Sequence, residues 1–177
     1  MGDSLITVVA IFLAAILMFI FPLMTLADRT DDISSLSVQT STTEFVDGIR
    51  TTGKMTLEDY EEYLGELTST GNTFDVEMLI QQLDENPGVK TTQAEATKIG
   101  ENLYYNIYTT QIMNQLNSTG RITLKEGDIV TVTVKNTNQT ISQMLRNFFY
   151  SITGNESSEI VGQHSGIVSV NGSTSGN

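Results

Sequence analysis

The amino-acid sequence predicts an α+β fold, with an N-terminal transmembrane helix that continues into an amphipathic stalk and then a small antiparallel-sheet head with packed helices. Three observations lead to this prediction. The run from Leu5 to Leu26 has 22 residues and no charge. The more polar remainder of the chain alternates between helical and strand-like spacing of its apolar residues. The most β-prone segment, Ile129 to Val134, lies in the last third.

The apolar run is long enough to cross a bilayer. As a helix it spans about 33 Å at roughly 1.5 Å per residue, and the hydrocarbon core is about 30 Å thick. Fourteen of its residues are Leu, Ile, Val or Phe, and each favours the membrane centre by roughly 0.3–0.6 kcal/mol. The side chains expected to contact lipid or to assemble with neighbouring helices are Leu5, Ile6, Val9, Phe12, Leu13, Ile16, Phe19, Ile20 and Leu23.

A cleaved signal peptide is the main alternative to a retained anchor. Pro22 and the segment Thr25 to Ala27 stand where a helix breaker and a cleavage site are expected. However, residues 1–4 contain no Lys or Arg, and the run is longer than the roughly 7–15 residues of a signal-peptide core. We therefore favour a retained anchor, and keep a cleaved signal and a buried helix of a soluble protein as alternatives.

Composition favours an exterior location for the rest of the chain. The positive-inside rule gives no orientation, because Arg29 is the one basic side chain near either end of the run. The chain has no cysteine, is rich in Ser and Thr, and carries a net charge of −12. We predict a single-pass membrane protein with a cytoplasmic N-terminus, whose parts are an anchor (1–27), a helical stalk (28–53), an exterior α+β head (54–172) and a disordered tail (173–177).

The acidic charge is concentrated in one half. Residues 28–86 contain fourteen Asp or Glu and three basic side chains, whereas residues 87–177 contain six of each. Such a field repels nucleic acid, so no nucleic-acid partner is expected. Thr56 can cap a helix in which Leu57, Tyr60, Leu64 and Leu67 recur at helical spacing. The other side of this helix is a possible acidic interaction face, made of Glu58, Glu61, Glu62 and Glu66.

The remaining segments before residue 120 predict a stalk, a strand and a helix. Loose helical spacing of apolar residues predicts that the anchor helix continues to about Gly53; these residues are Ile33, Leu36, Phe45, Val46 and Ile49. Alternation predicts a strand from Phe74 to Gln82, followed by a turn at residues 86–88 and a loop at 91–100. Residues 102–114 fit either a strand or a helix, and we favour a short helix from Tyr108 to Leu116.

The C-terminal third predicts a hairpin, a helix and a last strand. The turn signal at residues 125–128 joins Ile122 and Leu124 to Ile129–Val134 in the predicted hairpin. Thr140 can cap a helix that ends at Gly154 and packs its apolar side on its own sheet; that side is Ile141, Met144, Leu145, Phe148, Phe149 and Ile152. Ile160 to Val170 predicts a strand that is loosened by Gly162 and Gly166.

No catalytic or metal-binding set is evident in the sequence. His164 is the single histidine, and Ser165 beside it would face the opposite side of a strand, so the two form no catalytic dyad. The chain has no thiol, no phosphate-binding glycine loop and no calcium-loop spacing. Asp28, Asp31 and Asp32 could bind calcium only weakly. The sequence therefore predicts neither an enzyme nor a cofactor.

The layout resembles that of bacterial pilins and pseudopilins. The segment Gly127 to Val134, the apolar helix after it and the closing strand are similar to the head of TadE-like proteins of Tad (Flp) pilus loci. One feature differs. Family members that are processed after a glycine carry Glu at the fifth position after the cut. If Gly2 were that glycine, the fifth position in this chain would be Thr7. The resemblance implies a structural component of a bacterial surface filament or its assembly system.

Two hypotheses follow. In the first, the chain is a membrane protein that forms homo- or hetero-oligomers with other pilin-like subunits or with pilus assembly proteins. In the second, it is an anchored extracellular binding or sensing domain, or a secreted domain after signal cleavage. A partner would then meet the acidic face or the strand Ile160 to Val170.

Overall fold

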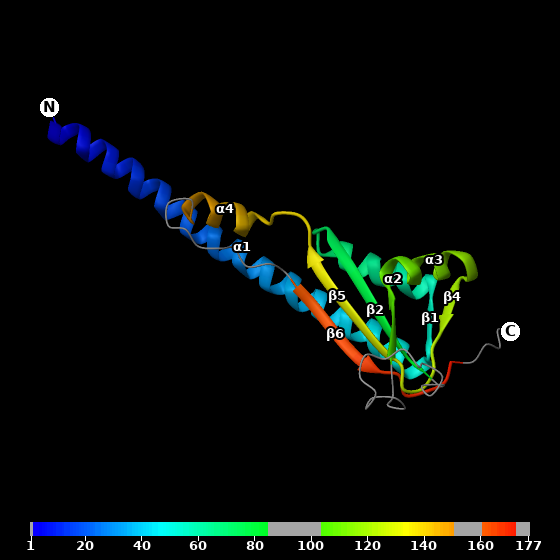
Figure 1. The fold of residues 1–177 in the computed structure, drawn as a ribbon. Helices are drawn as coiled ribbons and strands as arrows, with labels where there is room; N and C mark the ends of the chain where they lie inside the picture. Colours follow the sequence, from blue (N-terminus) through cyan, green and yellow to red (C-terminus); the bar gives the residue numbers. More distant parts are fainter. Residues whose placement is uncertain (1, 85–103, 151–160, 173–177) are drawn as a thin grey trace, which may run out of the picture.

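The computed structural model describes residues 2–84, 104–150 and 161–172, without the side chains of Arg146 and residues 148–150. Its elements, in chain order, are α1 (Gly2–Thr52), β1 (Lys54–Thr56), α2 (Leu57–Ser69), β2 (Phe74–Leu83), β3 (Tyr104–Tyr108), α3 (Thr109–Thr119), β4 (Arg121–Thr123), β5 (Ile129–Asn136), α4 (Ile141–Tyr150) and β6 (Val161–Ile167). Figure 1 shows a long helix whose first half projects from a small α+β head. The predicted turn at 86–88, loop at 91–100, helix end at Gly154 and tail at 173–177 lie outside the described residues, as do Ile152 and Ile160.

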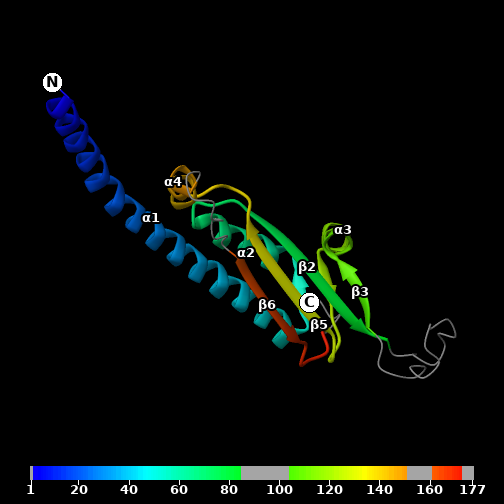
Figure 2. The same ribbon diagram turned by 60° about the vertical axis from the view of Figure 1, so that its left-hand side comes forward.

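Helix α1 is one continuous helix of 51 residues that contains Pro22. The predicted continuation of the apolar run into a second helical part is therefore confirmed. Figure 2 shows that this second part lies along the sheet rather than standing apart as a stalk. The helix ends where Gly53 takes a φ of 64°, a left-handed conformation that favours glycine.

The buried side of α1 agrees only in part with the apolar residues predicted for it, since Val46 and Ile49 are buried as predicted. Small or β-branched residues at helical spacing form the buried side: Ser34, Val38, Thr42, Val46 and Ile49. Ile33 and Leu36, which were expected on this side, are 70% and 68% exposed. The reason is a close approach of α1 to β6 at Val38 and Thr42, where small or β-branched side chains fit.

The main sheet has four antiparallel strands in the order β3-β2-β5-β6. Its inner face is apolar because alternate residues of β2 and β5 are buried and lie opposite one another: Val76 and Val134, Met78 and Val132, Ile80 and Val130. Helices α1 and α2 cover this face (Figures 1 and 2). The alternation predicted for β2 and the strand predicted at 129–134 are confirmed.

Two glycines of β6 bring α1 close to the sheet. A Cβ atom at Gly162 would lie 2.8 Å from Cγ1 of Val38 and 3.3 Å from Oγ1 of Thr42. A Cβ atom at Gly166 would overlap the side chain of Arg50. Each glycine allows a tight contact between strand and helix, while its predicted loosening of the strand stays a prediction.

Side chains of α1 also bond the outer backbone of β6, which is an edge strand. The side-chain amide of Gln39 donates to the carbonyl oxygen of Gln163 (3.1 Å), and its oxygen accepts the Gln163 amide hydrogen (3.3 Å). Arg50 Nε donates to the carbonyl oxygen of Ile167 over 2.9 Å. Groups that an edge strand normally leaves open are thus paired with the helix.

The predicted hairpin between residues 122–124 and 129–134 is wrong. Strand β4 pairs with β1 in a separate two-stranded sheet, in which Met55 lies opposite Ile122. The turn itself exists, since the buried carboxylate of Asp128 accepts the Lys125 and Leu83 amide hydrogens at 2.9 and 3.0 Å. These bonds turn the chain between two sheets instead of between neighbouring strands of one sheet.

Helices α2 and α3 form as predicted. The Thr56 side chain accepts the Asp59 amide hydrogen (3.1 Å), and the Asp59 carboxylate accepts the Thr56 amide hydrogen (2.9 Å), which completes a capping box. Helix α3 ends at Gly120, whose φ is 72°. The residues before α3 form strand β3. The sequence of this tyrosine-rich segment had fitted either a strand or a helix.

Helix α4 does not pack its apolar side on the sheet, as the sequence had suggested. Ile141 and Met144 are 67% and 50% exposed, while Ser142 and Gln143 are buried. The Thr140 hydroxyl donates to Asp31 (2.6 Å) and the Ser142 hydroxyl donates to Asp28. The link from β5 therefore carries α4 past the end of the sheet, where its polar side is held on α1 (Figure 1).

Replacing Thr140 by alanine is expected to loosen α4 without unfolding the head. Thr140 Oγ1 accepts the Gln143 amide hydrogen (3.2 Å) and donates to Asp31, so the change removes the N-cap and one of the two bonds to α1. Loss of an N-cap costs about 1 kcal/mol. Amide hydrogen exchange should become faster in residues 141–150 and stay unchanged in β2 and β5. Equal exchange in α4 of both proteins would contradict this role.

Candidate functional site

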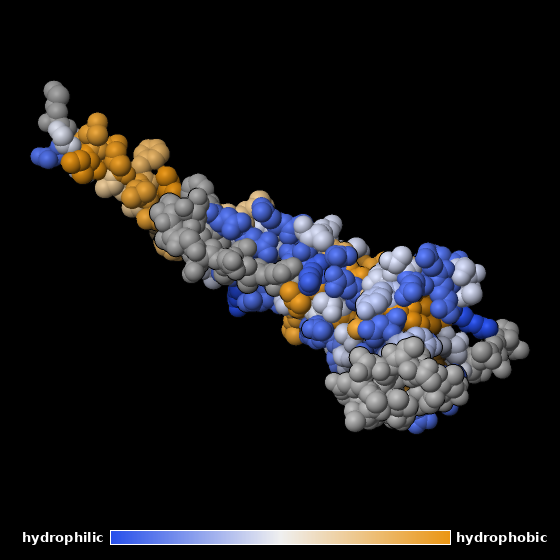
Figure 3. Space-filling view, in the orientation of Figure 1, coloured by the Kyte–Doolittle hydropathy of each residue, from blue (hydrophilic) through white to orange (hydrophobic). Residues whose placement is uncertain are grey.

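The first candidate surface is the projecting half of α1. Eight of the nine side chains predicted for membrane contact or assembly are exposed, with Phe12 at 70% and Phe19 at 73%, and Ile20 is half-buried. Within the described residues, α1 is the one helix that is long and apolar enough to span a membrane, and its apolar window buries none of its residues in the protein. Figure 3 shows this apolar band beside the polar head.

This exposure has a large energetic cost in water. Full burial of a side chain such as Leu or Phe is worth about 1.5–3 kcal/mol relative to exposure. The core helix of a soluble domain would hide such residues against its own fold, as the second half of α1 does. Within the described residues, the first half of α1 therefore has no apolar surface of its own fold to cover it.

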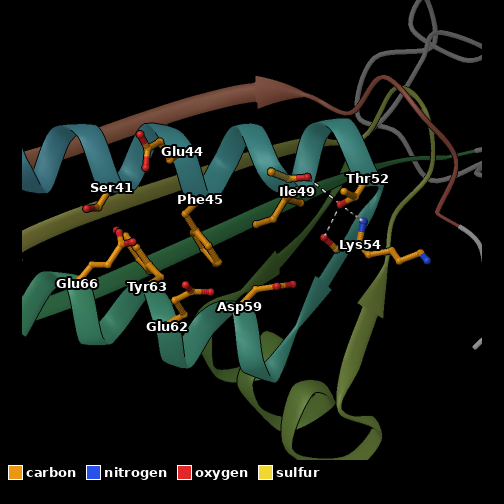
Figure 4. Close-up of a pocket in the computed structure, with 11 residues that line it drawn as sticks. Ser41, Glu44, Phe45, Ile49, Thr52, Lys54, Asp59, Glu62, Tyr63 and Glu66 are labelled. Atoms are coloured by element: carbon orange, nitrogen blue, oxygen red, sulfur yellow. Dashed lines mark hydrogen bonds between the residues drawn. The ribbon is translucent and has the colours of Figure 1, made fainter.

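The second candidate surface is an acidic groove between α1 and α2, with a volume of about 280 Å³. Of the predicted acidic face, Glu62 and Glu66 line this groove (Figure 4). Glu58 and Glu61 are exposed but do not line it. The remaining lining residues are Ser41, Glu44, Phe45, Gly48, Ile49, Thr52, Lys54, Asp59 and Tyr63. Four carboxylates and one ammonium group give the groove a net negative charge.

The apolar part of the groove is a pair of stacked rings. Phe45 of α1 and Tyr63 of α2 lie parallel, with centroids 4.4 Å apart. The Tyr63 hydroxyl lies 2.9 Å from Thr42 Oγ1 in a buried hydrogen bond. Burial raises the pKa of Tyr63 to about 12. The sequence offered no sign of this groove, because it depends on how close α1 and α2 come together.

The Tyr63 phenol makes the fold sensitive to high pH. Because its pKa is raised from 10 to about 12, its contribution to stability is fully present below pH 10 and is lost as pH rises through 12. Tyr63→Phe should remove this part of the alkaline loss, at a cost of about 1 kcal/mol at neutral pH for the lost hydrogen bond. Unfolding measured from pH 8 to 12 for both proteins tests this, and an unchanged alkaline slope in the variant would contradict it.

His164 takes part in a small charged cluster beside α1. Its Nε2 lies 3.4 Å from Oδ1 of Asp47, which also accepts a hydrogen bond from Arg50 (2.7 Å). The bond from Arg50 lowers the pKa of Asp47, with a smaller contribution from His164. Ser165 faces the other side of β6 and bonds Thr131 (2.8 Å). His164 and Ser165 therefore do not meet.

Strand β3 provides an exposed aromatic edge that the sequence analysis did not single out. Tyr104, Tyr105 and Tyr108 are 40%, 47% and 58% exposed. They lie on the edge of the sheet opposite β6. The cluster of tyrosines in the sequence could have pointed to this surface, because tyrosine is enriched at contact surfaces.

No group of three or more His, Asp or Glu side chains within residues 2–84, 104–150 and 161–172 is placed to hold a metal ion. Asp28 and Asp31, considered above for weak calcium binding, instead accept hydrogen bonds from Ser142 and Thr140.

No family model, no curated protein and no solved structure matches this chain.

Proposed function

We propose that this chain is a membrane-anchored, pilin-like structural component of a bacterial surface filament or of its assembly system. One observation carries the proposal. A single continuous helix joins an exposed apolar half to a second half that packs into an α+β head. This is the layout of pilins noted above, in which one helix serves both as anchor and as part of the head.

The division of α1 supports a role in assembly. Residues 5–26 hold apolar side chains on all sides, so they can exchange contacts with lipid for contacts with the same helix of other subunits. The packed half fixes the head to this helix through the Gly162 and Gly166 contacts. A head held in this way would keep one orientation relative to the helix in every copy, as a regular polymer requires.

Shearing of cells followed by N-terminal sequencing tests the proposal. We expect the protein in sheared surface filaments, with a mature N-terminus at Met1 or Asp3 that retains the apolar run. Recovery in the membrane fraction alone would contradict a filament subunit and leave an anchored protein. A mature N-terminus at Asp28 would show that the run is a cleaved signal and would overturn the proposal.

A second candidate function is suggested by the acidic groove. Glu44, Asp59, Glu62 and Glu66 surround the Phe45–Tyr63 stack, an arrangement suited to a cationic side chain with an apolar stem. An anchored binding domain of this kind would bind a lysine- or arginine-rich peptide. A double variant, Glu62→Gln with Glu66→Gln, should then weaken binding of such a peptide, while Glu58→Gln with Glu61→Gln should not. Equal binding by both variants would exclude the groove.

A further inference from the structure

In its first turn, α4 holds two polar side chains inward and two apolar side chains outward, while further along Leu145 is half-buried and Asn147 is exposed. Ser142 and Gln143 are 3% and 8% exposed, whereas Ile141 and Met144 are 67% and 50% exposed. A surface helix of a water-soluble domain has the opposite arrangement, with apolar residues against the core. This inversion indicates that the outer side of α4 faces an apolar environment.

The position of α4 identifies that environment. Its N-terminal end is bonded to Asp28 and Asp31 of α1. At about 1.5 Å per residue, these residues lie about 3 and 8 Å along the axis from Leu26, where the apolar run ends. Figures 1 and 2 show α4 crossing α1 at this level, beyond the end of the sheet. The first turn of α4 thus lies at the level of α1 where the apolar run ends.

We infer that α4 is an interfacial helix, which rests on the bilayer surface beside α1 and contacts lipid through Ile141 and Met144. This inference rests on the membrane anchor of the proposed function. When residues 5–26 span the bilayer, the end of the run lies at the membrane surface, and α4 lies at the same level. Helices of this kind place their apolar side about 5–10 Å into the boundary between headgroups and acyl chains.

The contacts between α4 and α1 suit this location. Asp28 and Asp31 are half-buried carboxylates close to the end of the apolar run. Their bonds to the Ser142 and Thr140 hydroxyls compensate for lost contact with water. The positive end of the α4 dipole also favours these two negative charges. A bilayer is therefore a better occupant of the outer side than a second protein, because it continues over both helices without a change of partner.

Single-cysteine labelling of the full chain can test the inference, because the chain has no native cysteine. A fluorophore is attached at Met144→Cys, and the protein is placed in vesicles of phosphatidylcholine and phosphatidylglycerol. Brominated lipid should quench this label strongly, and most when the bromine lies near the headgroups. Asn117→Cys on the exposed side of α3 is the matched control and should not be quenched. Ile141→Cys provides a second position on α4.

A third label distinguishes the inference from the proposed function. Leu13→Cys lies within the apolar run, and bromine deep in the acyl chains should quench it. Quenching of Leu13→Cys without quenching of either α4 label would overturn the interfacial helix while the anchor stands. Absence of quenching at Leu13→Cys and at both α4 positions would overturn the anchor and the interfacial helix together. Circular dichroism of each labelled protein checks that the fold is kept.

Discussion

Replacing Gly53 by valine is expected to lower the free energy of unfolding by about 2–5 kcal/mol, as the sum of two effects. Gly53 has a φ of 64°, a conformation that costs an L-residue about 1–2 kcal/mol. A Cβ atom there would overlap the backbone of Val170 and Gly172, and forced overpacking adds about 1–3 kcal/mol. Chemical unfolding of the full chain in detergent, followed by circular dichroism, measures the loss.

Gly71 provides the matched control for Gly53. It has a φ of 80°, but a Cβ atom there would meet no atom within 4 Å. Gly71→Val should therefore show the backbone cost alone, about 1–2 kcal/mol. Equal losses in the two variants would show that the approach of Gly53 to residues 170–172 does not contribute to stability.

Placing a charge in the middle of the apolar run should have the largest effect on location. Ile16 lies near the centre of residues 5–26, and an Asp at the centre of a spanning helix costs about 2.5–3.5 kcal/mol. Ile16→Asp should lower membrane partitioning by about two orders of magnitude, since about 1.4 kcal/mol corresponds to a factor of ten. Carbonate extraction of membranes measures the retained fraction, and the sheared fraction should lose the protein as well.

The same substitution at Ile33 is the control. Ile33 is exposed on the same helix but lies beyond the acidic residues that follow the run. Ile33→Asp should leave the protein in the membrane, and Ile16→Val should do the same. Loss of the protein from membranes in all three variants would point to general misfolding instead of a lost anchor.

Local signals explain why much of the fold was predictable. The capping box of Thr56, the alternation of β2 and the end of α3 at Gly120 depend on residues a few positions apart. Pairings between distant segments were not predictable in this way. Strand β4 pairs with β1, and Met55 lies opposite Ile122, 67 positions away in sequence. The predicted hairpin partner, residues 129–134, was much closer in sequence. The three-residue strand β1 carries too few residues to show a period.

The candidate surfaces also differ in whether local sequence could predict them. Composition alone marked the exposed apolar residues of α1. The groove depends on the distance between α1 and α2. The sequence alone could therefore not show that Glu62 and Glu66 line it and that Glu58 and Glu61 do not. The apolar stripe of α4 was visible, but its direction was not, because a stripe of Ile141 and Met144 has the same pattern whether it faces a sheet or a lipid surface.

The bonds between Gln39 and strand β6 have a consequence for association between copies of the chain. The amide of Gln39 occupies the position that the backbone of a neighbouring strand would take against Gln163. Addition of a strand from a second head at Gln163 therefore requires α1 to leave this edge. A head that has lost its helix exposes this edge and becomes a template for strand addition, the first step of many aggregates. Docking of α1 thus protects each newly made copy before it meets its neighbours.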